Sequence, residues 1–70
     1  MRLEKVIHKA LENARDDSYI LSLMVSQRAH QLAEGMEPLL KVDKNKMKLT
    51  DIALLEIAEG LVTIDEIIEP

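Results

Sequence analysis

The chain has 70 residues and a formal net charge of −4, and its 47% hydrophobic residues include a single aromatic, Tyr19. The lack of cysteine excludes disulfides and cysteine-ligated zinc. A chain this short buries only about 60% of its unfolded surface, so we expect one domain over residues 1–70 with a thin stability margin. This much aliphatic surface on so small a chain predicts that another molecule covers part of it.

The first predicted helix covers about residues 3–14. Hydrophobic residues recur there at the three- and four-residue spacing that lines one side of a helix. They are Leu3, Val6, Ile7, Ala10, Leu11 and Ala14. Several polar residues between 13 and 18 can end this helix and cap the next one.

The second predicted helix, about residues 17–34, is hydrophobic almost all round from Tyr19 to Val25. Such a pattern is typical of a helix covered on more than one side. Gly35 is expected to end this helix in the left-handed conformation. A stripe of small side chains also runs along it and leaves a shallow groove, open either to another helix of this chain or to a segment of a partner. The stripe consists of Ser18, Ser22, Ser26, Ala29 and Ala33.

Arg28 interrupts the hydrophobic side of the second predicted helix, between Val25 and Leu32. A charge there is costly unless the side chain reaches water or meets a carboxylate. Two interpretations stay open. Arg28 either extends to solvent, or it makes a bidentate bond to a carboxylate or to backbone carbonyls in the third helix or in a partner. Exchange of Arg28 for lysine distinguishes the two, because only the first tolerates lysine.

Residues 36–49 have no helical period and predict an irregular linker, whose Pro38-Leu39-Leu40 segment is apolar enough to pack against a helix. Thr50 is expected to cap the third predicted helix, about residues 50–59, with Asp51 in its first turn.

The third predicted helix is expected to stop at Gly60, and an S/T-x-x-E pattern predicts a last short turn at 64–68. Its predicted buried side consists of Leu54, Ile57, Ala58 and Leu61. Since no strand pattern appears, the predicted fold is all-α, a small domain of three main helices.

The charge is unevenly distributed along the chain. After Lys48 there is no lysine or arginine, and every charged residue is a carboxylate. An acidic end repels phosphate backbones and favours a basic protein surface. We therefore expect no direct, specific nucleic-acid binding, and we interpret the lysine cluster as a solvated loop. This cluster consists of Lys41, Lys44, Lys46 and Lys48.

No catalytic, metal or membrane signature emerges from the sequence. His8 precedes Glu12, and His30 precedes Glu34, at four-residue spacing. A transition-metal site usually needs three or four ligands, so we interpret both histidines as exposed helix-surface residues. We expect no catalytic residue, no metal and no cofactor. Because no apolar stretch can span a bilayer and the first residues lack a signal-peptide core, we expect a cytoplasmic location.

Four segments stand in an order and spacing that resemble the omega subunit of bacterial RNA polymerase, over roughly residues 14–62. They are Tyr19 to Val25, Arg28-Ala29-His30-Gln31-Leu32, Pro38-Leu39-Leu40 and Ile52-Ala53-Leu54-Leu55-Glu56-Ile57-Ala58-Glu59-Gly60. The resemblance implies a non-catalytic accessory subunit that clamps the C-terminal region of the β′ subunit. It also implies that this subunit helps β′ fold and join β and the two α subunits, and that it stabilises the finished enzyme.

The resemblance further implies which residues contact β′ or shape the surface that does. They are Arg28, Ala29, Gln31, Leu32, Ile52, Leu54, Glu56, Ile57, Glu59 and Gly60. Leu55 departs from the family pattern, because many members have an arginine there. The start Met1-Arg2-Leu3-Glu4 does not match the Met-Ala-Arg start with which some members bind ppGpp, so that site is not carried over.

Two alternatives come from other classes of protein. The hydrophobic stripe can serve self-association, as in a small dimeric regulator or an antitoxin-like dimer. The lysine cluster can serve nucleic-acid binding, in which case the binding depends steeply on salt.

Overall fold

The structure, a computed structural model, describes residues 3–62 and is built from three helices. They are α1 (Leu3–Asn13), α2 (Ser18–Ala33) and α3 (Leu49–Ala58), and no strand occurs within the described range. The all-α prediction is confirmed, and each helix boundary lies within one residue of its predicted position. The predicted turn at 64–68 lies outside the described residues.

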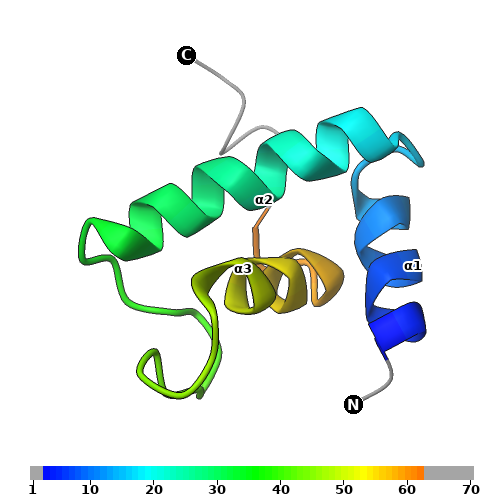
Figure 1. Ribbon diagram of the computed structural model, residues 1–70. Coiled ribbons are helices and arrows are strands. Elements are labelled where there is room, and N and C mark those ends of the chain that lie inside the picture. The colour runs from blue at the N-terminus through cyan, green and yellow to red at the C-terminus, as the bar shows by residue number, and fades with distance from the viewer. Residues whose placement is uncertain (1–2, 63–70) are drawn as a thin grey trace.

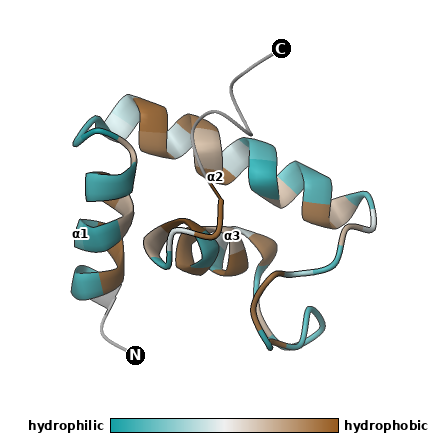
Figure 2. Ribbon diagram, turned by 180° about the vertical axis from the view of Figure 1, so that it is seen from behind, coloured by the Kyte–Doolittle hydropathy of each residue, from teal (hydrophilic) through white to brown (hydrophobic). Residues whose placement is uncertain are grey.

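Helix α3 occupies the centre of the fold (Figure 1). Both α1 and α2 pack against it, whereas α1 and α2 make little contact with each other. On α1, hydrophobic residues lie on the side toward α3 and hydrophilic residues lie outside (Figure 2). This arrangement follows from the sequence, because the apolar residues of α1 recur at helical spacing along one side.

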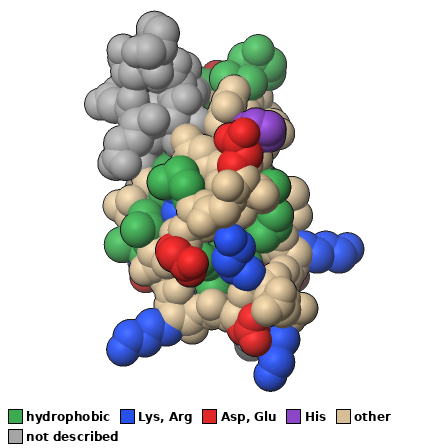
Figure 3. Space-filling view, turned by 90° about the vertical axis from the view of Figure 1, so that its left-hand side faces the viewer, with side chains coloured by type: hydrophobic (Ala, Val, Ile, Leu, Met, Phe, Trp, Pro, Cys, Tyr) green, Lys and Arg blue, Asp and Glu red, His purple; other side chains and the backbone are tan. Residues whose placement is uncertain are grey.

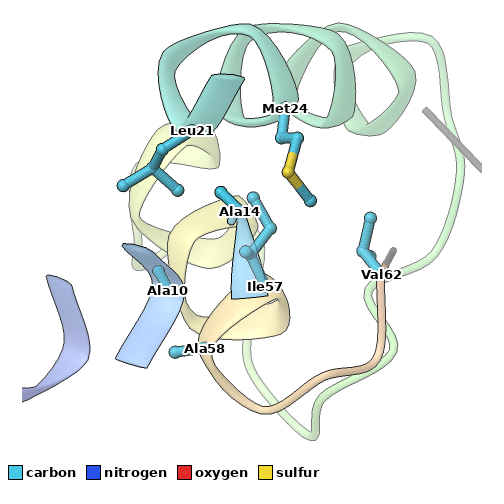
Figure 4. Packing of buried hydrophobic residues seen from close by; sticks show 7 residues of the cluster. All are labelled: Ala10, Ala14, Leu21, Met24, Ile57, Ala58 and Val62. Carbon is cyan, nitrogen blue, oxygen red and sulfur yellow. The ribbon is translucent and has the colours of Figure 1, made fainter. Parts of the chain in front are cut away.

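Two clusters of buried side chains form the core. The first joins all three helices and is drawn in Figure 4: Ala10, Ala14, Leu21, Met24, Ile57, Ala58 and Val62. The second joins the end of α2 to the start of α3: Leu32, Ile52 and Ala53. Val42 and Met47 of the linker pack against this second cluster. The linker therefore contributes to the core, although it contains no helix.

The helix ends follow local backbone chemistry. Asp17 precedes α2, and one of its carboxylate oxygens accepts hydrogen bonds from the backbone N–H groups of Tyr19 and Ile20, at 2.9 and 3.4 Å. Gly35 and Gly60 have φ angles of +114° and +75° and follow the ends of α2 and α3. Left-handed residues at these positions let later N–H groups reach the last carbonyls of each helix. Both predictions of a terminating glycine are confirmed.

Two details predicted for α3 are wrong. The residue before its first turn is Lys48, which makes no side-chain capping bond, so Thr50 is not the cap. Packing sets this boundary, because Leu49 lies against the second cluster and extends the helix by one residue beyond the prediction. Leu61 is 40% exposed and is not part of the buried side. It follows the turn at Gly60, where the helical spacing no longer applies.

Candidate functional site

Arg28 and Glu56 form a buried ion pair that joins α2 to α3. Their exposed fractions are 3% and 0%. Nε of Arg28 donates to Oε1 of Glu56 at 2.6 Å, and Nη2 donates to Oε2 at 3.0 Å. Two parallel bonds of this kind make the pair bidentate. Of the two interpretations left open by the sequence, the structure selects the bidentate bond, to a carboxylate of the third helix.

The same two side chains also hold the beginning of the linker. Nη1 of Arg28 donates to Oε1 of Gln31 at 3.1 Å, and Nη2 donates to the backbone carbonyl of Glu37 at 3.3 Å. The backbone N–H of Leu39 donates to Oε2 of Glu56 at 2.7 Å. A buried ion pair is tolerated when further hydrogen bonds satisfy its remaining polar atoms, and no buried side-chain nitrogen or oxygen of residues 3–62 lacks a partner. The ion pair therefore fixes where the chain leaves α2.

The segment Pro38-Leu39-Leu40 only partly fulfils its predicted packing. The backbone N–H of Leu39 is bound to Glu56, but Leu39 as a whole is 55% exposed. Val42 and Met47 provide the linker's hydrophobic packing instead.

Figure 3 views the molecule from the end where α2 passes into the linker. On this face the hydrophobic side chains lie in separate groups among charged ones.

The ten residues of the predicted interaction site differ in how deeply they are buried. Five are buried within the chain: Arg28, Leu32, Ile52, Glu56 and Ile57. Ala29, Gln31 and Leu54 are half-buried, and Glu59 and Gly60 are exposed. The buried side chains are thus in a position to determine the shape of a surface, and the other five are in a position to be touched.

An open groove lies among the three helices, with a volume of about 400 Å³. It is lined by Ile7, Leu21, Ser22, Val25, Ser26, Thr50, Asp51 and Leu54. Ser18, Ser22 and Ser26 are all exposed, so no helix of residues 3–62 covers this part of the small-residue stripe. Sequence reasoning found the serines but missed Ile7, Thr50 and Asp51. They come from elements far apart in the sequence, and no local pattern joins them.

Both histidines lie on the surface, as interpreted from the sequence. His8 and His30 lie 3.8 and 3.5 Å from carboxylate oxygens of Glu12 and Glu34, and all four side chains are more than half exposed. Over the described part of the chain, no three metal-ligating side chains gather into one site. No helix there is long and apolar enough to cross a membrane.

The fold and the site define a small all-α protein with a buried ion pair and an open, serine-rimmed groove. A family model described as RNA polymerase Rpb6 matches residues 10–64 of the chain. Curated relatives named DNA-directed RNA polymerase subunit omega match nearly its whole length. The chain belongs to this family of RNA polymerase omega subunits.

Three of these relatives illustrate the similarity. The omega subunit of Nitratiruptor sp. is 58% identical over 65 residues, which cover 93% of both chains. That of Campylobacter lari is 51% identical and covers 99% of this chain and 96% of its own. That of Campylobacter jejuni subsp. jejuni is 54% identical and covers 97% and 92%. No solved structure gives a significant match.

Proposed function

We propose that the chain is a non-catalytic accessory subunit of bacterial RNA polymerase that binds the β′ subunit. In this role it assists the folding of β′ and its assembly with β and the two α subunits, and stabilises the finished enzyme. One observation carries the proposal, the 58% identity to an omega subunit over 93% of both chains. The whole of residues 1–70 acts as a single omega-like domain.

The surface of α2 supports a role in binding another protein. Arg28 is the only Asp, Glu, Lys or Arg in this 16-residue helix, and it is buried. Tyr19, at the start of the helix, is 71% exposed. A surface helix normally carries charged residues on its outer side, and a helix without them is usually covered. In the proposed assembly a partner protein covers part of this surface.

Copurification tests this function. The tagged full-length chain is expressed in its own bacterium, captured from the lysate and washed at moderate salt, and the retained proteins are identified. We expect β′ together with β and α in near-equal amounts. An unrelated small acidic protein with the same tag is the control, and it should retain none of these subunits. Retention of the chain alone would contradict the proposal and favour a self-associating module.

A further inference from the structure

We propose that the groove among α1, α2 and α3 receives a β′ segment that presents hydrophobic side chains and one lysine or arginine, whose cation pairs with Asp51. The inference rests on the proposed function and deepens it, because it assigns the place and the chemistry of the contact. The groove is the one defined above, lined by eight residues from Ile7 to Leu54.

The lining of the groove suits a segment that inserts side chains. Leu21, Val25 and Leu54 provide an aliphatic floor, and Ile7 of α1 closes one side with 41% of its surface exposed. The groove is shallow and open, and its volume of about 400 Å³ leaves room for inserted side chains.

The polar residues of the groove let a partner backbone approach closely. Ser22 and Ser26 are exposed on the side of α2 that borders the groove. Their small side chains leave room beside the helix, and their hydroxyl groups can donate or accept hydrogen bonds. Neither residue is needed to cover the core, because the buried residues of α2 are Leu21, Met24, Arg28 and Leu32.

The negative charge of Asp51 at the groove favours a partner segment that carries a lysine or an arginine. Asp51 is exposed at its edge, and no cation of residues 3–62 forms an ion pair with it. No lysine, arginine or histidine lines the groove. A cation of the partner can therefore pair with this exposed carboxylate, which favours association by charge complementarity. A second copy of the chain is disfavoured, because the same groove on that copy carries no lysine, arginine or histidine of residues 3–62 that could pair with Asp51.

A matched pair of leucine substitutions tests the location. Ser26→Leu fills the groove, whereas Gln27→Leu adds the same side chain at the neighbouring exposed position outside it. Binding of the full-length variants to purified β′ is measured by titration, and folding of the free variants by circular dichroism. We expect Ser26→Leu to weaken binding about tenfold and Gln27→Leu to change it less than about twofold, with equal helicity. Equal binding by both variants would overturn the location.

A second pair tests the charge. Asp51→Lys reverses the carboxylate at the groove, and Glu4→Lys reverses the carboxylate in the first turn of α1, outside the groove. Only Asp51→Lys should weaken binding about tenfold or more, and Asp51→Asn should reduce the salt dependence of the affinity. Equal effects of the two reversals would overturn the assignment of Asp51.

The two proposals fail in distinguishable ways. If the wild-type chain does not bind β′ at all, the proposed function and this inference both fall. If the wild type binds and the groove variants behave like their controls, the function stands and the inference falls. If sedimentation shows a wild-type dimer that Ser26→Leu dissociates, a second copy of the chain occupies the groove. That result would overturn the inference that a β′ segment binds there.

Discussion

At the scale of single residues, the buried ion pair between Arg28 and Glu56 is a contact whose disruption is costly, because removal of one partner leaves the other charge buried. A chain of this length is stable by roughly 4–10 kcal/mol, so one broken buried pair can unfold it. Arg28→Lys should lower the free energy of unfolding by about 1–3 kcal/mol, because lysine cannot reproduce both bonds to Glu56 or reach the Glu37 carbonyl at the same time. Urea denaturation followed by circular dichroism measures the change.

A double-mutant cycle provides the control for this prediction. Arg28→Met leaves a buried carboxylate without its cation, and we expect a loss of about 3–5 kcal/mol. The double variant Arg28→Met with Glu56→Leu should be more stable than Arg28→Met alone, although it still lacks an acceptor for the Leu39 N–H. The cycle is completed by the single variant Glu56→Leu. If the loss in the double variant equals the sum of the losses in the two single variants, the pair is not energetically coupled.

Asn13 joins two helix ends through its side chain. Its Nδ2 donates to the backbone carbonyls of Ile57 and Ala58 at 2.8 and 3.2 Å, near the end of α3. Terminal carbonyls of a helix have no partner within the helix, so this bond satisfies groups that otherwise need water. Asn13→Ala should lower the unfolding free energy by about 1 kcal/mol in a chemical denaturation curve. Asn45→Ala, in the exposed linker, is the matched control and should leave the curve nearly unchanged.

At the scale of the elements, the two terminating glycines give a graded prediction. A Cβ atom added to Gly35 or Gly60 meets nothing within 4 Å, so the cost of alanine is one of backbone conformation. The φ of Gly60, +75°, lies near the left-handed minimum at about +57°, whereas that of Gly35, +114°, lies far from it. Gly60→Ala should lower the free energy of unfolding by about 1 kcal/mol, and Gly35→Ala should lower it by more. The midpoint of thermal unfolding should fall in the same order. The reverse order would contradict this explanation.

The elements also show how far the sequence alone predicts the fold. Hydrophobic spacing, together with the polar residues and glycines at the helix ends, predicts all three helices to within one residue of their bounds. The prediction for the start of α3 is wrong because the packing of Leu49 determines this boundary. No capping side chain does so. Val42 and Met47 follow no period, so their place in the core depends on the path of the linker.

The candidate site could be predicted from the sequence only in part, because its residues come from different helices. Arg28 stood out locally, as a charge within an apolar stripe. Its partner lies 28 residues away, and the third helix offered several carboxylates that the sequence could not rank. Burial distinguishes them, because Glu56 is enclosed by the fold whereas Asp51 and Glu59 are exposed. The groove joins residues of all three helices, so it exists only once they are packed.

At the scale of the whole molecule, shape and stability connect the fold to the proposed assembly. The principal extents are 32 × 30 × 16 Å, so the molecule is flat and has a large surface for its mass. The outer side of α2 has no lysine, arginine, aspartate or glutamate, and no second layer of residues 3–62 covers it. Under the proposed function, binding to β′ therefore adds stability that the free chain lacks.

Hydrogen exchange of the free and bound chain measures this gain. At a free β′ concentration about 100 times the Kd, binding stabilises the folded chain by about 2.7 kcal/mol. Amides of α2 and α3 that exchange only through global unfolding should then exchange about 100-fold more slowly. The Ser26→Leu variant at the same β′ concentration is the control, and its weaker binding should reduce the slowing about tenfold. Unchanged exchange in the wild type at every β′ concentration would contradict the proposed assembly, because a ligand specific for the folded state must slow global opening.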